Sequence, residues 1–242
     1  MTVLTVIRFV ASWQDGGVSP SVIIAVRHGE SEANLAYRLA GDTPLVYERG
    51  DDEVTLTDQG RAQASALGRL LATLPDGEAP ELVWCSPYLR AMDTWRIAQD
   101  TWGIRPLPVT VDARLRDQET GEFARYNPAA AEERFPGERA RREAEGAWAY
   151  RPPGGESLAD VVDRLRDLLA DLRLRAGGRR VVIVAHDSVV LGLRHVIAGD
   201  PDARLAAVLE FAPVLNASVS VWRTGGERFE LVRFNDVAHL PS

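Results

Sequence analysis

Short runs of β-branched and apolar residues alternate along the chain with longer segments of helical periodicity. Six such runs predict strands, at residues 21–26, 81–86, 107–112, 179–186, 218–223 and 229–234. The clearest helix is predicted over 156–178, where Ser157 is a suitable N-cap and Gly177 and Gly178 end the apolar stripe. This alternation is typical of a mostly parallel sheet with helices on both faces. We therefore expect a three-layer α/β fold.

The chain has the size of one such domain. Its 242 residues, 45% of them hydrophobic, are enough to bury a full core. Residues 1–20 read as an N-terminal extension, and 41–55 as an acidic loop. Residues 124–155 are rich in charge, Ala and Pro and carry no strand signal, so we expect a helical lid inserted into a single domain over 1–242.

The charge of the chain limits its partners. The net charge is -7 and no basic run occurs, so the sequence lacks the electrostatic signature of a nucleic-acid binder. All 28 basic residues are Arg. Any anionic substrate must therefore be held by a local cluster of arginines.

The sequence also favours a cytoplasmic protein. Arg8 interrupts the apolar patch near the N-terminus, which excludes a clean signal peptide, and no stretch approaches the roughly 20 apolar residues that span a bilayer. The single cysteine, Cys85, excludes an internal disulfide and suits a reducing compartment. We expect no membrane partner, while a homodimer is compatible with the sequence.

Cationic and imidazole side chains follow the ends of several predicted strands. Arg27 and His28 end the first strand, and His186 ends the strand over 179–186. Arg90 lies in the first turns of a helix that follows the strand over 81–86. Ligands of open α/β sheets bind beyond the carboxyl ends of the strands, so these four side chains are expected to share one crevice. Arginine binds phosphate oxygens through two parallel hydrogen bonds, and the arrangement therefore predicts a phosphoryl site.

These residues carry a family resemblance. "RHGESEAN" (27–34) resembles the signature of the histidine phosphatase superfamily, which includes cofactor-dependent phosphoglycerate mutases and small phosphomonoesterases. Further similar blocks follow in the family's order: "LTDQGRAQA", "SPYLRAMDT", "RLRDQETGEF", "PPGGESLADVVDR", "VVIVAHDS" and "FNDVAHL". The resemblance implies a phosphoglycerate mutase-like fold of the broad-specificity phosphatase type, with no metal and no bound cofactor.

The resemblance also implies roles. His28 would be the nucleophile that takes the phosphoryl group, with Arg27, Arg90 and His186 holding its oxygens and Asn34 adding a donor. A histidine attacks through a nitrogen lone pair and must be neutral, which neighbouring arginines favour.

The proton donor to the leaving oxygen has three candidates. Asp117 keeps the family's spacing to Gly121 and is favoured, although it is one methylene shorter than the family's Glu. Glu119 would share a face with Asp117 in an extended segment, so periodicity cannot choose between them. Asp187 follows His186 directly, where the acid phosphatase branch of the family has its donor.

Three functions are compatible with these residues. Hydrolysis of a small phosphate monoester is preferred over phosphoglycerate mutase activity, because the mutases use a Lys in the substrate-binding lid and this chain has none. A non-catalytic phosphate-binding protein is the third hypothesis. Arg151, in the expected lid, is a candidate contact to the rest of the substrate. Selectivity is assigned to residues 35–55 and 124–155, and the sequence does not name the ester.

Overall fold

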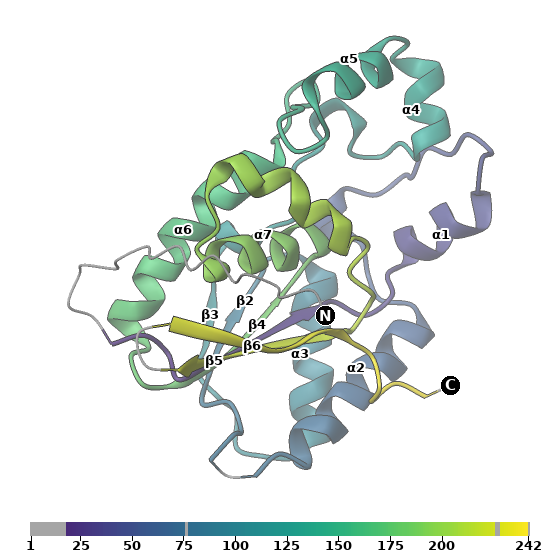
Figure 1. The fold of residues 1–242 in the computed structure, drawn as a ribbon. Coiled ribbons are helices and arrows are strands. Elements are labelled where there is room, and N and C mark those ends of the chain that lie inside the picture. The colour runs from purple at the N-terminus through teal and green to yellow at the C-terminus, as the bar shows by residue number, and fades with distance from the viewer. Residues whose placement is uncertain (1–17, 76, 226–227, 242) are drawn as a thin grey trace, which may run out of the picture.

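A six-stranded sheet forms the centre of the molecule. The computed structural model describes residues 18–75, 77–225 and 228–241 (Figure 1), so most of the expected N-terminal extension lies outside it. The strand order is β3-β2-β4-β1-β5-β6. The strands are β1 (Val22–Arg27), β2 (Leu82–Cys85), β3 (Val109–Val111), β4 (Arg180–Ala185), β5 (Val219–Gly225) and β6 (Arg228–Asp236). β1 to β4 run parallel, and β5 is antiparallel to both of its neighbours, β1 and β6, which confirms the mostly parallel sheet.

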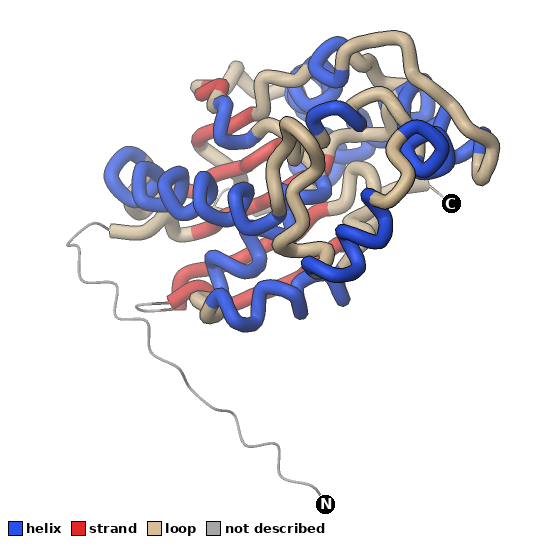
Figure 2. The backbone as a smooth tube through the Cα atoms, turned by 90° about the horizontal axis from the view of Figure 1, so that it is seen from above, coloured by secondary structure: helices blue, strands red, loops and turns tan. Residues whose placement is uncertain are grey.

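Both faces of the sheet are buried under helices, as Figure 2 shows. Successive side chains of a strand point to opposite faces. In β1, Ile23 and Ala25 accordingly join one hydrophobic cluster, while Ile24 and Val26 join the other. The first cluster includes α6 (Leu158–Arg175) and α7 (Asp187–Ala198), and the second includes α2 (Asp58–Ala72) and α3 (Leu89–Trp102). The three-layer α/β prediction is therefore confirmed.

Two helices show how local sequence sets their ends. α6 begins after Ser157, whose hydroxyl accepts from Asp160 N while the Asp160 side chain accepts from the Ser157 amide, so the predicted N-cap is confirmed. α1 (Glu32–Ala40) has the same kind of capping box, formed by Ser31 and Asn34. None of the residues of α1 is fully buried, so it has no apolar stripe that the sequence could reveal.

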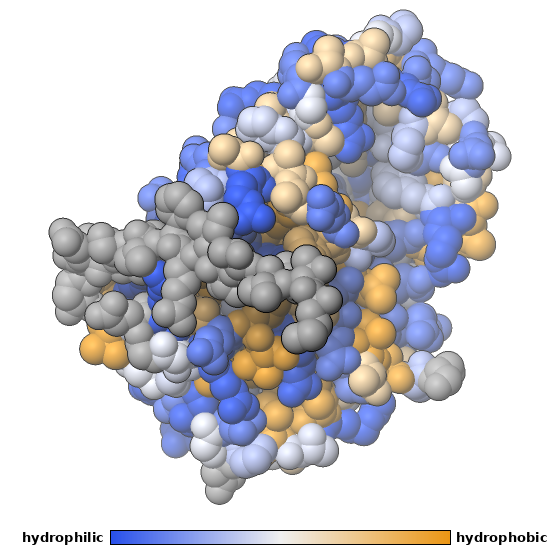
Figure 3. All heavy atoms as spheres, in the orientation of Figure 1, coloured by the Kyte–Doolittle hydropathy of each residue, from blue (hydrophilic) through white to orange (hydrophobic). Residues whose placement is uncertain are grey.

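The expected lid is helical and packs on the 41–55 segment. It contains α4 (Pro128–Arg134) and α5 (Glu138–Glu145), preceded by the 3-10 turn η3 (Gly121–Phe123). α5 has no buried residue, and Figure 3 shows mainly hydrophilic side chains at the top of the molecule, where α4 and α5 lie in Figure 1. Val46 forms a β-bridge with Tyr126, and Tyr47 N donates to Arg125 O at 2.6 Å. The two segments expected to select the substrate are thus in contact.

Three further 3-10 segments complete the described chain: η1 (Asp51–Glu53), η2 (Ala113–Leu115) and η4 (Asp202–Phe211). Within the described ranges, every helix is too short or too polar to cross a bilayer.

Candidate active site

Two buried histidines meet at the carboxyl ends of β1 and β4. His28 directly follows β1, and His186 follows β4 at the N-cap position of α7. These strands are neighbours in the sheet, and His28 N donates to Ala185 O at 2.9 Å. The ring centroids lie 5.2 Å apart, and the side chains are 2% and 0% exposed. The structure therefore brings the two histidines together at one end of the strands, as expected from the sequence.

Arg90 joins the two histidines from the first turn of α3. Its Nε donates to His28 Nε2 at 3.2 Å, and the residue is 4% exposed. Arg27 is half-buried and donates from its terminal NH1 to the Val214 carbonyl, and its positive charge acts on both histidines. We call Arg27, His28, Arg90 and His186 the His28 cluster. All four residues predicted from strand ends and motifs belong to it.

The hydrogen bonds of His28 define which nitrogen carries its proton. Nδ1 lies 2.7 Å from the Gly29 carbonyl, which can only accept, so Nδ1 is the protonated nitrogen. Nε2 receives the Arg90 N–H and therefore carries the lone pair. Burial is the main cause that holds the pKa of His28 well below its usual range, and the positive charge of Arg90 is the second. The ring is thus neutral near pH 7 and presents a nucleophilic Nε2.

His186 is neutral for the same reasons. Burial and the charges of Arg90 and Arg27 lower its pKa well below the ordinary value. Its Nε2 lies 2.8 Å from Ser86 Oγ, and its Nδ1 lies 3.5 Å from Asp117 Oδ2 without a hydrogen bond to it.

The three candidate acids differ in their surroundings. Asp117 Oδ2 lies 3.3 Å from Arg90 NH2, while Oδ1 accepts from Ser188 Oγ at 2.7 Å. Glu119 is half-exposed and paired with Arg116 at 2.7 Å, away from the cluster. Asp187 accepts from Val214 N at 3.2 Å, and burial raises its pKa. Of the three candidate acids, Asp117 is therefore the one whose side chain contacts Arg90 of the His28 cluster.

Asn34 and Arg151, the two expected substrate contacts, lie in different settings. Asn34 Oδ1 accepts from Asn216 Nδ2 at 3.1 Å, and the same Nδ2 donates to the His28 carbonyl at 3.2 Å. Asn34 is thus tied to the backbone of His28. Arg151 is 61% exposed and pairs with Asp160 at 2.6 Å, at the start of α6. Its hydrogen bonds join it to Arg141 of the 124–155 segment and to Asp160 of α6.

The structure adds residues that sequence reasoning missed. Asp51, in η1, forms a two-pronged ion pair with Arg90, with Oδ1 3.0 Å from NH1 and Oδ2 3.1 Å from NH2. Burial raises the pKa of Asp51 although Arg90 opposes the rise. Ser86, the partner of His186, follows β2 directly, and the position of a hydroxyl at the end of a buried strand could have revealed it.

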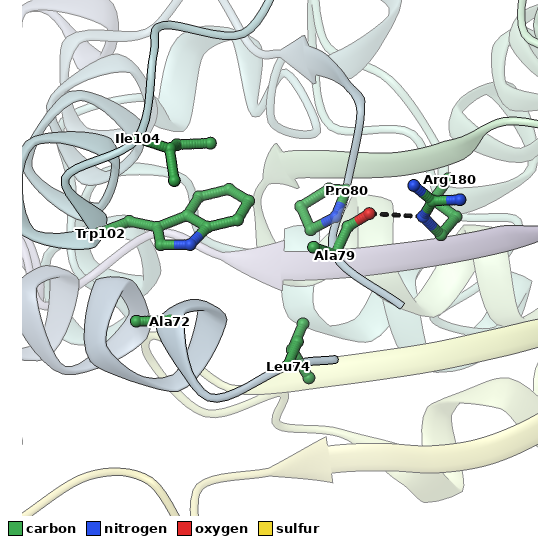
Figure 4. A pocket seen from close by; sticks show the side chains of 7 residues that line it. All are labelled: Ala72, Leu74, Ala79, Pro80, Trp102, Ile104 and Arg180. Carbon is green, nitrogen blue, oxygen red and sulfur yellow. Dashed lines mark hydrogen bonds between the residues drawn. The ribbon is translucent and has the colours of Figure 1, made fainter. Parts of the chain in front are cut away.

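A separate cavity lies at the opposite end of the strands. Its volume is about 440 Å³, and Figure 4 shows its lining. It is lined by Ala72, Leu74, Ala79, Pro80, Trp102, Ile104 and Arg180. Arg180 begins β4 whereas His186 follows its last residue, so this cavity is not the His28 cluster. Among the described residues, no group of three or more His, Cys, Asp or Glu is arranged to hold a metal ion.

Comparison with known proteins identifies relatives that cover most of the chain. A family model described as histidine phosphatase superfamily (branch 1) matches residues 23–237. Glucosyl-3-phosphoglycerate phosphatase of Mycolicibacterium vanbaalenii is 32% identical over 186 residues, 74% of this chain and 75% of that protein. The 2,3-bisphosphoglycerate-dependent phosphoglycerate mutase 2 of Gloeobacter violaceus is 33% identical over 173 residues, 70% of this chain and 72% of that protein.

One further relative and one solved structure are also similar to the chain. Phosphoglycerate mutase-like protein AT74 of Arabidopsis thaliana is 35% identical over 164 residues, 65% of this chain, and the match spans about half (48%) of that protein. The solved structure of a mycobacterial glucosyl-3-phosphoglycerate phosphatase in complex with VO3 has a TM-score of 0.72 and 28% identity. That match covers 90% of this chain and 100% of the other.

Proposed function

The chain belongs to branch 1 of the histidine phosphatase superfamily, and from this premise we propose that it is a phosphomonoesterase working through a phosphohistidine on His28. The substrate is a small phosphorylated metabolite. The observation that carries the proposal is the contact of the His28 Nε2 lone pair with Arg90 Nε at 3.2 Å inside a buried cluster. This contact sets a neutral nucleophilic nitrogen beside a fixed positive charge that can hold a phosphoryl oxygen.

The proposed reaction has two displacements at phosphorus. His28 Nε2 attacks, the bond to the ester oxygen breaks, and Asp117 gives its proton to that oxygen. The Asp117 carboxylate then takes a proton from water, which attacks the phosphohistidine and releases phosphate. Arg27, Arg90 and His186 bind the equatorial oxygens, where charge accumulates in both transition states. The aspartate side chain is long enough for this role, because its Oδ2 lies 3.3 Å from Arg90 NH2 and 3.5 Å from His186 Nδ1.

Hydrolysis is favoured over mutase chemistry. A mutase must return the phosphoryl group to the same bound substrate, which requires a lid that retains it. Two arginines of the expected lid hold acidic partners of their own chain: Arg141 pairs with Glu138 at 2.6 Å, and Arg151 pairs with Asp160. A cytoplasmic location belongs to the same proposal, since it keeps the buried thiol of Cys85 reduced.

The proposal is tested by turnover and by trapping. Wild-type protein should hydrolyse p-nitrophenyl phosphate with EDTA present, and His28→Ala should lose turnover by a factor of about 10³ or more while keeping its melting temperature. Quenching the wild type with labelled substrate should leave acid-labile, base-stable phosphate on His28. His239→Gln, outside the cluster, is the matched control and should remain active. Undiminished turnover by His28→Ala would contradict the mechanism.

A further inference from the structure

The guanidinium of Arg90 is shared between the reaction centre and the acidic 41–55 segment. Its Nε faces His28, whereas NH1 and NH2 both contact the Asp51 carboxylate, at 3.0 and 3.1 Å. NH1 also donates to the Asp51 carbonyl. An ion pair with two parallel contacts to a buried guanidinium is strong and fixes the geometry of both partners. η1 is therefore held against the cluster by the residue that is to bind phosphate.

Asp51 and the proposed acid Asp117 contact the same nitrogen of Arg90. Arg90 NH2 contacts Asp51 Oδ2 at 3.1 Å and Asp117 Oδ2 at 3.3 Å. Because Asp117 is proposed to protonate the leaving oxygen, the shared nitrogen places Asp51 next to the same oxygen. A group on the alcohol must therefore pass close to the Asp51 carboxylate.

The residues around Asp51 provide few free positive charges for a second anionic group on the substrate. The 41–55 segment has five acidic residues and one basic residue, Arg49, which pairs with Glu32 at 2.8 Å. Arg125, which adjoins this segment, donates to the Glu48 carbonyl at 3.1 Å. Four arginines of neighbouring segments have carboxylate partners. These pairs are Arg38 with Glu30, Arg116 with Glu119 and Glu156, Arg151 with Asp160, and Arg164 with Glu156. The phosphoryl group has Arg27 and Arg90, and an additional anion would face acidic side chains.

We propose that Asp51 is a specificity-determining residue that restricts the enzyme to phosphate monoesters whose alcohol carries no negative charge. The inference rests on the proposed phosphatase function. Repulsion between a substrate carboxylate and Asp51 acts in a partly desolvated site, where like charges interact strongly. Discrimination of this kind, built from repulsion, leaves the binding of the phosphoryl group itself intact.

A matched pair of substrates tests the proposal. Glycerol 3-phosphate and 3-phosphoglycerate differ only in a hydroxymethyl group that is replaced by a carboxylate. The wild type should prefer glycerol 3-phosphate by about 10- to 100-fold in kcat/KM. Asp51→Asn removes the charge and should lower this ratio by about tenfold, chiefly by lowering KM for 3-phosphoglycerate. A loss of Arg90 positioning would slow both esters and would leave the ratio unchanged.

Asp52→Asn is the control, because Asp52 is exposed on the same turn and its charge acts on Asp51 only weakly. It should keep the wild-type ratio. The proposal would be overturned if wild type and Asp51→Asn had the same ratio of kcat/KM for the two esters, or if the wild type preferred 3-phosphoglycerate. In either case hydrolysis of p-nitrophenyl phosphate would still support a phosphatase. A wild type that hydrolysed none of the three esters would overturn the proposed function as well.

Discussion

The two histidines of the cluster present opposite ring nitrogens to the reaction. His28 is protonated on Nδ1 through the Gly29 carbonyl and offers Nε2 as nucleophile. Ser86 Oγ accepts from Tyr88 N at 3.3 Å, so its hydroxyl proton is available to His186 Nε2. The neutral His186 then carries its own proton on Nδ1, facing Asp117. One ring is thus arranged to attack and the other to donate to a phosphoryl oxygen.

Asp117→Asn should reveal the general acid through its dependence on the leaving group. An alkyl ester such as glycerol 3-phosphate needs a proton on its leaving oxygen, so the variant should lose about 10² to 10⁴ in kcat/KM. p-Nitrophenolate leaves without help, so the same variant should be affected much less on p-nitrophenyl phosphate. The Asn side-chain oxygen can still accept the hydrogen bond from Ser188 Oγ, so the backbone around residue 117 should keep its position. Steady-state kinetics on both substrates measure the difference.

The other candidate carboxyl groups are the controls. Glu119→Gln alters a half-exposed residue paired with Arg116, and Asp187→Asn alters one that accepts from Val214 N. Neither should show a selective defect on the alkyl ester. A selective defect in Asp187→Asn alone would assign the acid to the residue after His186 and refute the role of Asp117.

At the scale of elements, the segment that carries Asp117 is held by α6 and by residues 155–156, which precede that helix. Arg164, on α6, donates to the Asp117 carbonyl at 3.1 Å. Glu156 N donates to the Glu119 carbonyl at 2.7 Å, and Gln118 Nε2 donates to the Glu156 carbonyl at the same distance. A Cβ on Gly155 would lie 2.4 Å from the Glu119 carbonyl oxygen. The two backbones therefore approach as closely as glycine allows.

Gly155→Ala should separate these backbones and displace Asp117. We expect a loss of about 1–3 kcal/mol in the free energy of unfolding, the usual cost of overpacking. We also expect kcat/KM to fall about tenfold on an alkyl ester and less on p-nitrophenyl phosphate, since the displaced group is the acid. Gly77→Ala is the control, because a Cβ there meets nothing within 4 Å. Wild-type kinetics and stability in Gly155→Ala would show that the close approach is unimportant.

The same elements show how far the sequence could lead. The buried stripe of α6 and its N-cap Ser157 made that helix predictable, and strand ends together with family motifs placed the His28 cluster at one edge of the sheet. α1 was not predicted because none of its residues is fully buried. The pairing of Asp51 with Arg90 joins residues 39 positions apart and depends on the path of an irregular loop. No local pattern encodes such a path.

At the scale of the whole molecule, folding buries two titratable rings beside Arg27 and Arg90. Both are neutral there, since burial and Arg90 lower the pKa values of His28 and His186 well below the ordinary value of 6.5. In the unfolded chain the same rings take up protons below about pH 6.5. Between that pH and the lowered pKa values, these two rings bind more protons in the unfolded state, so they lower the free energy of unfolding as the pH falls.

His186→Asn should flatten this pH dependence. Each buried neutral histidine contributes up to about 1.4 kcal/mol of lost stability per pH unit below 6.5, so the variant should lose stability on acidification by up to that much less per unit than the wild type. Contributions of the other shifted groups, among them Asp51 and Asp187, are present in both proteins and cancel to first order in the comparison. Urea unfolding between pH 5 and 7.5 measures both slopes, whatever the absolute stability of the variant. Identical slopes would mean that His186 is protonated in the folded protein, and a protonated His186 could not be the neutral Nδ1 donor beside Asp117.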